Sequence, residues 1–120
     1  MSEDMYDDGF VKNYNIDISK KCIEMMLNRN VFRRPEIEWS IMDCRKLTYE
    51  DESFDLIIDK STLDCLMCGA TAELDVCQMI KEIQRILKTN GLYVIISLES
   101  SENREFVFEM PHLSFEVEYI

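Results

Sequence analysis

The sequence is short of the residues that mark phosphate-binding loops and metal sites. Its 120 residues include three glycines, two prolines and one histidine. Neither G-x-G-x-x-G nor G-x-x-x-x-G-K-[ST] occurs, so a nucleotide-binding α/β domain built on those loops is the weakest interpretation. Cys65 and Cys68 form C-x-x-C, but His112 is distant and no second pair follows. Half a ligand set argues against a metal site.

Positive charge is scarce as well. Lys and Arg total 13 against 24 Asp and Glu, which gives a net charge of −11. This balance argues against nucleic-acid binding, which needs clustered basic residues. The simpler explanation of the negative charge is that it keeps the protein soluble. The functional alternative is that it attracts a protein partner with a basic surface.

Long apolar segments are also lacking. No run approaches the roughly 20 apolar residues needed to span a bilayer. The acidic start, MSEDMYDDGF, has no apolar stretch of the kind found in secretory signals. We therefore expect a cytoplasmic protein with no membrane partner, in which the five cysteines stay reduced.

Apolar residues nevertheless make up 47% of the chain, which predicts a packed core in one domain over residues 1–120. Strand-like and helix-like segments alternate along it. Such alternation is typical of an α/β fold with a mostly parallel sheet and helices on both faces, a three-layer αβα architecture. Helices are predicted over residues 2–8, 19–30, 71–88 and 102–108, and strands over residues 11–16, 37–41, 54–58, 92–96 and 115–119.

The predicted helices carry recognisable end signals. Ser2 and Ser19 suit N-cap positions, and Gly9 suits the left-handed residue that follows a helix. Within residues 71–88, apolar side chains recur at helical spacing and form one stripe, which Asn90-Gly91 is expected to end. The stripe consists of Val76, Ile80, Ile83 and Leu87.

Polar residues follow several predicted strands at the point where each ends. Asp17, Asp43 and Asp59 come after separate apolar runs, and Ser97 comes after another. Parallel strands end at one edge of a sheet, where open α/β sheets bind ligands, so we expect these groups to line one groove. The alternative is that they are ordinary turn and cap residues, among which Asp and Ser are common.

Four blocks of the sequence carry a family resemblance. They are NIDIS, RRPEIEWSIMDCRKL, SFDLIIDKSTLDCL and EIQRILKTNGLYVIIS, in this order and reaching to Ser97. Together they resemble class I S-adenosylmethionine-dependent methyltransferases, and most of all the methyltransferase-like proteins that modify lysines of translation elongation factor 1-alpha. The resemblance implies a Rossmann-like sheet, S-adenosylmethionine as cofactor, and methyl transfer to a protein acceptor, a lysine amine.

The resemblance also implies roles around the cofactor. Asp17 would accept hydrogen bonds from both ribose hydroxyls, for which a carboxylate offers two oxygens. Ile18 would pack on the adenine, and Asp43 would accept from the adenine amino group. Cys44 would turn its backbone N–H toward the ring, and Asp59 would lie nearest the methyl group.

An acceptor pocket is implied after the fourth family strand. Asp59, Lys60, Thr62 and Asp64 would form its wall. For Lys60 and Asp64 the alternatives are a local salt bridge, or an N-cap of the following helix by Ser61 or Thr62. A lysine acceptor must lose a proton before methylation, and no single general base is assigned.

The sequence departs from the family pattern at its start. The family's first strand and glycine-rich loop are expected to be missing, so that two half-sheets with unpaired edges remain. Such edges would pair between two copies, as a homodimer. Ser61 also stands where the family motif D-K-G-T-L-D has glycine. The alternative to an active enzyme is a non-catalytic domain that acts through protein contacts or oligomerisation.

Overall fold

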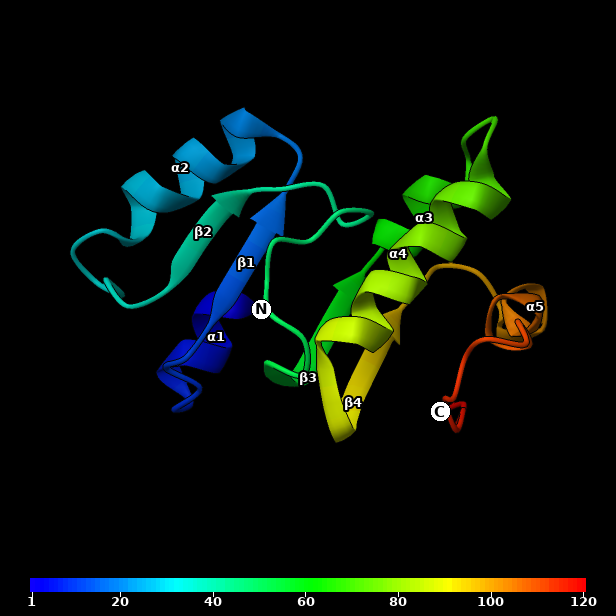
Figure 1. The fold of residues 1–120 in the computed structure, drawn as a ribbon. Coiled ribbons are helices and arrows are strands. Elements are labelled where there is room, and N and C mark those ends of the chain that lie inside the picture. Colours follow the sequence, from blue (N-terminus) through cyan, green and yellow to red (C-terminus); the bar gives the residue numbers. More distant parts are fainter. The chain divides into compact units, whose positions relative to one another are not determined.

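The computed structural model describes the backbone of residues 1–120 and every side chain except that of Ser101. It contains two compact units, Met1–Leu47 and Thr48–Ile120. Each unit holds one two-stranded parallel sheet with its own helices (Figure 1). The expected α/β fold with parallel strands is therefore confirmed, and the strands form two separate pairs. Among the described residues, no helix has both the length and the apolar character that a membrane crossing requires.

The first unit is a strand–helix–strand arrangement preceded by a short helix. Helix α1 (Ser2–Asp7) leads to β1 (Tyr14–Asp17), α2 (Lys20–Asn30) and β2 (Glu38–Ile41). The two strands pair in parallel, from Tyr14 opposite Glu38 to Asp17 opposite Ile41. Ser19 is the N-cap of α2 as predicted, because its hydroxyl accepts the Cys22 N–H at 3.2 Å.

Of the two end signals predicted for α1, the structure confirms the one at the C-terminal end and contradicts the one at the N-terminal end. Gly9 follows the C-cap residue Asp8 and adopts φ +105°, a conformation that glycine reaches without steric cost. The assignment of Ser2 as N-cap is wrong. Its hydroxyl donates to Asn15 Oδ1 at 2.5 Å, and Met1 precedes the helix without a side-chain cap. A contact with the β1 strand therefore replaced the local cap.

The second unit contains β3 (Phe54–Lys60), α3 (Thr62–Met67), α4 (Ala72–Ile86), β4 (Leu87–Ile96), a short 3-10 helix (Ser101–Asn103) and α5 (Glu105–Phe108). The strands β3 and β4 pair in parallel, with α3 and α4 forming the connection between them. The stripe predicted along residues 71–88 is confirmed as the core of this unit. Its members are 0% to 8% exposed, and Met79 and Ile86 are buried beside them.

The boundary between α4 and β4 differs from the prediction. The helix ends at Ile86 rather than Lys88, because Leu87 pairs with Phe54 and begins the strand. The pairing is then interrupted and resumes at Leu92, opposite Leu56. Residues 88–91 form an irregular excursion within β4, so Asn90-Gly91 turns the chain inside a strand instead of ending a helix.

The predicted strand over residues 115–119 is wrong. The described backbone there is neither helix nor strand. Gln84 Nε2 donates to the carbonyl of His112 at 3.3 Å, and the Ser114 N–H donates to Gln84 Oε1 at 3.1 Å. The segment that leads into these residues is thus hydrogen-bonded to a helix side chain rather than to a sheet edge. Alternating apolar residues alone do not form a strand without a backbone partner.

Candidate functional site

In the first unit, two of the predicted acids lie at the same edge of a sheet. Asp17 is the last residue of β1, and its carbonyl accepts the Met42 N–H at 3.1 Å. Asp43 follows Met42 directly, just beyond the end of β2. Since β1 and β2 are adjacent and parallel, both carboxylates stand at the carboxyl ends of neighbouring strands, where α/β sheets bind ligands.

The Asp17 side chain is oriented by the turn into α2. Its Oδ1 accepts the Ser19 N–H at 2.7 Å. Burial, followed by the negative charge of Asp17, raises the pKa of the Cys22 thiol. A carboxylate has about four acceptor positions, so the bonds from the Ser19 N–H and the Cys22 thiol leave part of its capacity for a further donor such as a ribose diol. Ile18 is 69% exposed beside it and provides an apolar surface of the kind an adenine ring packs on.

Asp43 is already engaged by a neighbour. Arg45 Nε donates to Oδ1 at 3.0 Å, Arg45 Nη2 donates to Oδ2 at 2.7 Å, and the Arg45 backbone N–H donates to Oδ1 at 2.9 Å. These bonds, led by the one from the side chain, lower the pKa of Asp43. An adenine amino group would therefore share this carboxylate with Arg45. Cys44 lies between them, half-buried and not in a disulfide.

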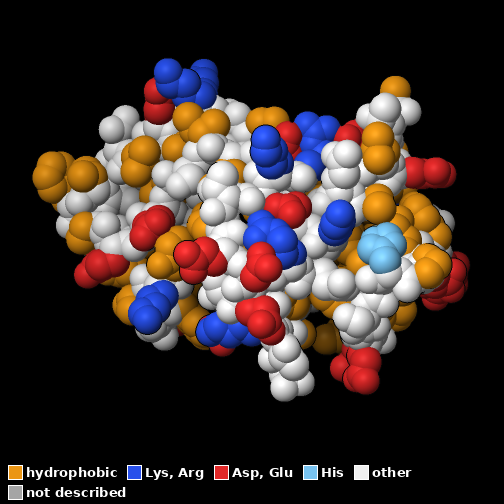
Figure 2. Space-filling model, in the orientation of Figure 1, with side chains coloured by type: hydrophobic (Ala, Val, Ile, Leu, Met, Phe, Trp, Pro, Cys, Tyr) orange, Lys and Arg blue, Asp and Glu red, His pale blue; other side chains and the backbone are white. Residues whose placement is uncertain are grey.

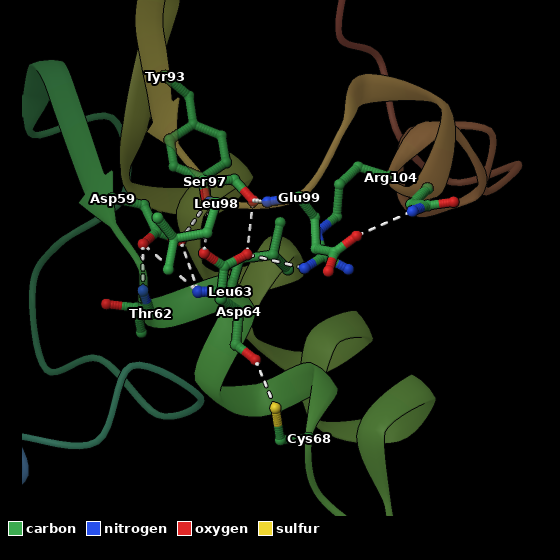
Figure 3. A network of polar contacts seen from close by, with 11 residues as sticks. Asp59, Thr62, Leu63, Asp64, Cys68, Tyr93, Ser97, Leu98, Glu99 and Arg104 are labelled. Atoms are coloured by element: carbon green, nitrogen blue, oxygen red, sulfur yellow. Dashed lines mark hydrogen bonds and ion pairs between the residues drawn. The ribbon is translucent and has the colours of Figure 1, made fainter.

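In the second unit, Asp59 is a buried capping residue near the end of β3. It is 5% exposed. Its carboxylate accepts the Thr62 N–H at 2.7 Å and the Leu63 N–H at 3.1 Å, and it also accepts the Tyr93 hydroxyl at 3.1 Å (Figure 3). The start of α3 is therefore capped by Asp59. Ser61 occupies the N-cap position, as one alternative interpretation of this segment had it, but its side chain forms no cap bond, and the Asp59 carboxylate accepts the N–H groups instead.

Asp64 forms the centre of a second set of polar contacts. It accepts the Ser97 hydroxyl at 2.5 Å and the Leu98 N–H at 3.0 Å, and it pairs with Arg104 at 2.7 Å (Figure 3). These contacts, the Ser97 hydrogen bond first, lower the pKa of Asp64. The salt bridge that is the alternative role of Asp64 is present, but its cation is the distant Arg104 rather than a local residue. Nothing local in the sequence indicates this partner, which lies 40 positions further on.

The carboxyl edge of the second sheet thus gathers several of the predicted residues. Asp59 pairs with Ile95 and Lys60 with Ile96, so Ser97 follows β4 at the level where β3 ends. Lys60 and Thr62 are exposed at this edge. The structure brings Asp17 and Asp43 together, and separately Asp59, Asp64 and Ser97. That all of them line one groove stays a prediction.

The C-x-x-C pair has no metal-like surroundings. Cys65 and Cys68 are exposed, and the Cys68 thiol donates to the Asp64 carbonyl at 3.3 Å. Within the described part of the chain, no three His, Cys, Asp or Glu side chains are grouped so that they could hold a metal ion.

Comparison with known families identifies the fold that presents these residues. Residues 1–95 match the family model described as "Methyltransferase domain". The chain belongs to this methyltransferase family. The match supports the resemblance to class I S-adenosylmethionine-dependent methyltransferases found in the sequence blocks.

Relatives of this methyltransferase domain are large proteins. It is 40% identical over 111 residues to the eEF1A lysine and N-terminal methyltransferase homolog of Drosophila melanogaster, covering 91% of this chain and 16% of the relative. It is 36% identical over 100 residues to the eEF1A lysine and N-terminal methyltransferase of Homo sapiens, covering 82% of this chain and 14% of the relative. The chain therefore spans about a sixth of the length of these relatives.

Solved structures agree on the fold. The crystal structure of the PH0226 protein from Pyrococcus horikoshii superposes with a TM-score of 0.68 at 29% identity, covering 78% of this methyltransferase domain and 42% of that chain. A SAM-dependent methyltransferase from Methanosarcina mazei gives a TM-score of 0.57 at 17% identity, covering 78% and 45%. The Rossmann-like methyltransferase fold is thereby established for this chain.

Proposed function

We propose that this chain contributes to S-adenosylmethionine-dependent methylation of a protein, with a lysine amine as the acceptor. The family assignment supports the reaction class, and the names of the relatives support a protein acceptor. The observation that carries the proposal is the Asp17 carboxylate at the end of β1. It has acceptor capacity to spare, lies beside an exposed apolar side chain, and shares its sheet edge with Asp43.

The residues of the first unit fit the adenosyl part of the cofactor by their chemistry. Asp17 would accept from the two ribose hydroxyls, and Ile18 would cover one face of the adenine. Asp43 and the backbone of Cys44 would meet the edge of the ring, with Arg45 keeping Asp43 ionised. When bound, S-adenosylmethionine supplies a methyl group on a sulfonium centre, whose departure as a neutral thioether needs little chemical assistance from the protein.

The residues of the second unit would position the acceptor. Asp59 fixes the start of α3 and so sets the place of Lys60 and Thr62, which are exposed. Alignment of the acceptor nitrogen with the methyl carbon is the main requirement of this reaction. An acceptor amine loses its proton more easily where water is excluded, because burial disfavours the ammonium form. We assign no single catalytic base.

Net charge supports a basic protein partner. The chain carries a charge of −11, which favours encounter with positively charged surfaces. On the face drawn in Figure 2, acidic side chains are interspersed with basic ones and do not gather into one patch. The proposed attraction is therefore a property of the total charge rather than of one acidic surface on that face.

A second candidate function is a non-catalytic domain that acts through protein contacts. It is favoured by the two separate two-stranded sheets, in which no third strand pairs with any of the four strands of the described residues. It is favoured also by the carboxylates of Asp59 and Asp64, each of which already accepts several hydrogen bonds from the chain itself.

Calorimetric titration with S-adenosylmethionine tests the proposal. We expect saturable heat for the chain and a loss of affinity of at least about tenfold for Asp17→Asn, because hydrogen bonds to a charged group contribute about 1.5–3 kcal/mol each. Asp8→Asn is the matched control, since Asp8 is an exposed acid of the same unit that lies outside the sheet edge. No heat from a chain that melts cooperatively would favour the non-catalytic function. Equal affinity of wild type and Asp17→Asn would remove the ribose assignment.

A further inference from the structure

Arg104 is a buried cation held against the acceptor side of the second sheet. Its residue is 8% exposed, and its Nη2 donates to Asp64 Oδ1 at 2.7 Å (Figure 3). Asp64 lies on α3, and its other partners are Ser97 and Leu98, which directly follow β4. The ion pair therefore stands at the carboxyl edge of β3 and β4, where the lysine acceptor is proposed to bind.

The two partners of this ion pair are satisfied to different degrees. Asp64 accepts from Ser97, Leu98 and Arg104 and has most of its acceptor positions in use. Arg104 has five N–H donors. Its Nε is buried and has no hydrogen-bond partner among the described residues. A buried donor without an acceptor costs free energy, so the guanidinium occupies this position at a disadvantage.

The backbone that follows Arg104 is held by contacts that do not involve the Arg104 side chain. Helix α5 follows Arg104 and has only four residues and no side-chain cap. Val107 of α5 is completely buried and its N–H donates to the Arg104 carbonyl at 3.0 Å. Val107 thus holds α5 in place through its own burial and backbone bond, independently of the contact between the Arg104 side chain and Asp64.

We propose that Arg104 is an internal competitor of the acceptor, a cation of this chain that occupies Asp64 until a substrate cation replaces it. An amine-bearing side chain carries the same charge as the guanidinium and reaches the same carboxylate. Asp64 would then bind the ammonium group of the incoming lysine before that group loses its proton. A substrate would have to bind Asp64 more strongly than Arg104 does. The proposal rests on the proposed function, because it assumes that the acceptor enters at this edge.

Nuclear magnetic resonance of the labelled chain without cofactor tests the competition. The probe is a short peptide with one lysine and blocked ends, and the reporter is the Leu98 backbone amide, which donates to Asp64. We expect Arg104→Gln to bind the peptide about tenfold more tightly than wild type, because the free energy of about one charge-assisted hydrogen bond no longer opposes binding. Arg104→Lys should bind like wild type, because it keeps the competing charge. The matched control is Arg29→Gln, which removes an exposed arginine paired with Glu3.

Several results would overturn the competition. They are unchanged or weaker binding by Arg104→Gln, equal tightening by Arg104→Lys, and full binding by Asp64→Asn. If Arg104→Gln does not fold, the wild-type chain provides the test. Displacement predicts that added peptide shifts the resonance of Arg104 Nε. A resonance that does not move refutes displacement.

Methylation assays separate this proposal from the proposed function. Binding is measured without cofactor, so an inactive chain that shows the displacement refutes the function and supports the competition. Methyl transfer with the same KM in wild type and Arg104→Gln supports the function and overturns the competition. A lower KM at unchanged kcat in Arg104→Gln supports both.

Discussion

Ser61 holds a backbone conformation that glycine adopts at lower cost. Its φ is 63° and its ψ is 8°, in the left-handed region. Hydrogen bonds fix both backbone groups of Ser61. The Ser61 N–H donates to the Ile96 carbonyl at 3.0 Å, and the Ser61 carbonyl accepts the Cys65 N–H at 3.1 Å. Asp59 meanwhile draws the Thr62 N–H inward. A residue with a Cβ is thus strained at the point where the second sheet presents its edge.

Replacing Ser61 with glycine is therefore expected to stabilise the chain. The gain in the free energy of unfolding should be about 0.5–1 kcal/mol, since relief of about 1–2 kcal/mol of left-handed strain is offset partly by the greater freedom of glycine in the unfolded chain. Chemical denaturation measures the change. Ser40→Gly in β2 is the control and should lose stability, because that serine has ordinary strand geometry. A loss for both variants would contradict the strain at Ser61.

At the scale of elements, β4 is shaped by one close approach. A Cβ on Gly91 would lie 2.8 Å from Cγ and Cδ1 of Leu87 and 2.8 Å from the Lys88 carbonyl. Leu87 is itself held, because it is buried and pairs with Phe54. The excursion of residues 88–91 therefore folds tightly back on the first residue of the strand.

Gly91→Ala should accordingly destabilise the second unit. We expect a loss of about 1–3 kcal/mol, the usual cost of forcing extra atoms into a packed site. Denaturant unfolding followed by circular dichroism would measure it. Gly69→Ala offers the comparison, since its added Cβ would meet its nearest atom, the Leu66 carbonyl oxygen, only at 3.3 Å. A neutral Gly91→Ala would mean that residues 88–91 can relax away from Leu87.

At the scale of the whole molecule, the dominant feature is that each strand has a paired partner on one side only. The described residues form two two-stranded sheets, and no third strand covers either of them. Backbone groups along a sheet edge are a template for pairing with another chain. Part of that hazard is countered by the net charge of −11, which makes two copies repel.

We expect the chain to self-associate through these edges as its concentration rises, and more strongly at high salt, where the repulsion is screened. Sedimentation velocity would follow the dimer. Hydrogen exchange compared at low and high concentration should show slower exchange for strand amides of β1, β2, β3 or β4. A chain that stays monomeric at high salt, or a dimer whose strand amides exchange as fast as those of the monomer, would contradict pairing at the edges.

The sequence by itself determined the elements whose signals lie within a few residues. Ser19 caps α2, Gly9 follows α1 with a positive φ, and the apolar stripe of α4 is buried. Asp17 and Asp43 lie at one sheet edge, as the ends of two parallel strands must. The cap and the stripe depend on groups three or four positions apart, so the local pattern contains both partners. The shared edge of Asp17 and Asp43 instead follows from the parallel direction of their two strands.

Only the tertiary structure decided which distant groups meet. Leu87 joined a strand because Phe54 is opposite, and residues 115–119 formed none because Gln84 holds the chain that precedes them. Asp59 became a cap with Tyr93 as a further donor, and Asp64 received Arg104. A buried carboxylate is stabilised by whichever donors the fold places within reach, and that choice depends on packing across the chain, which no local pattern encodes.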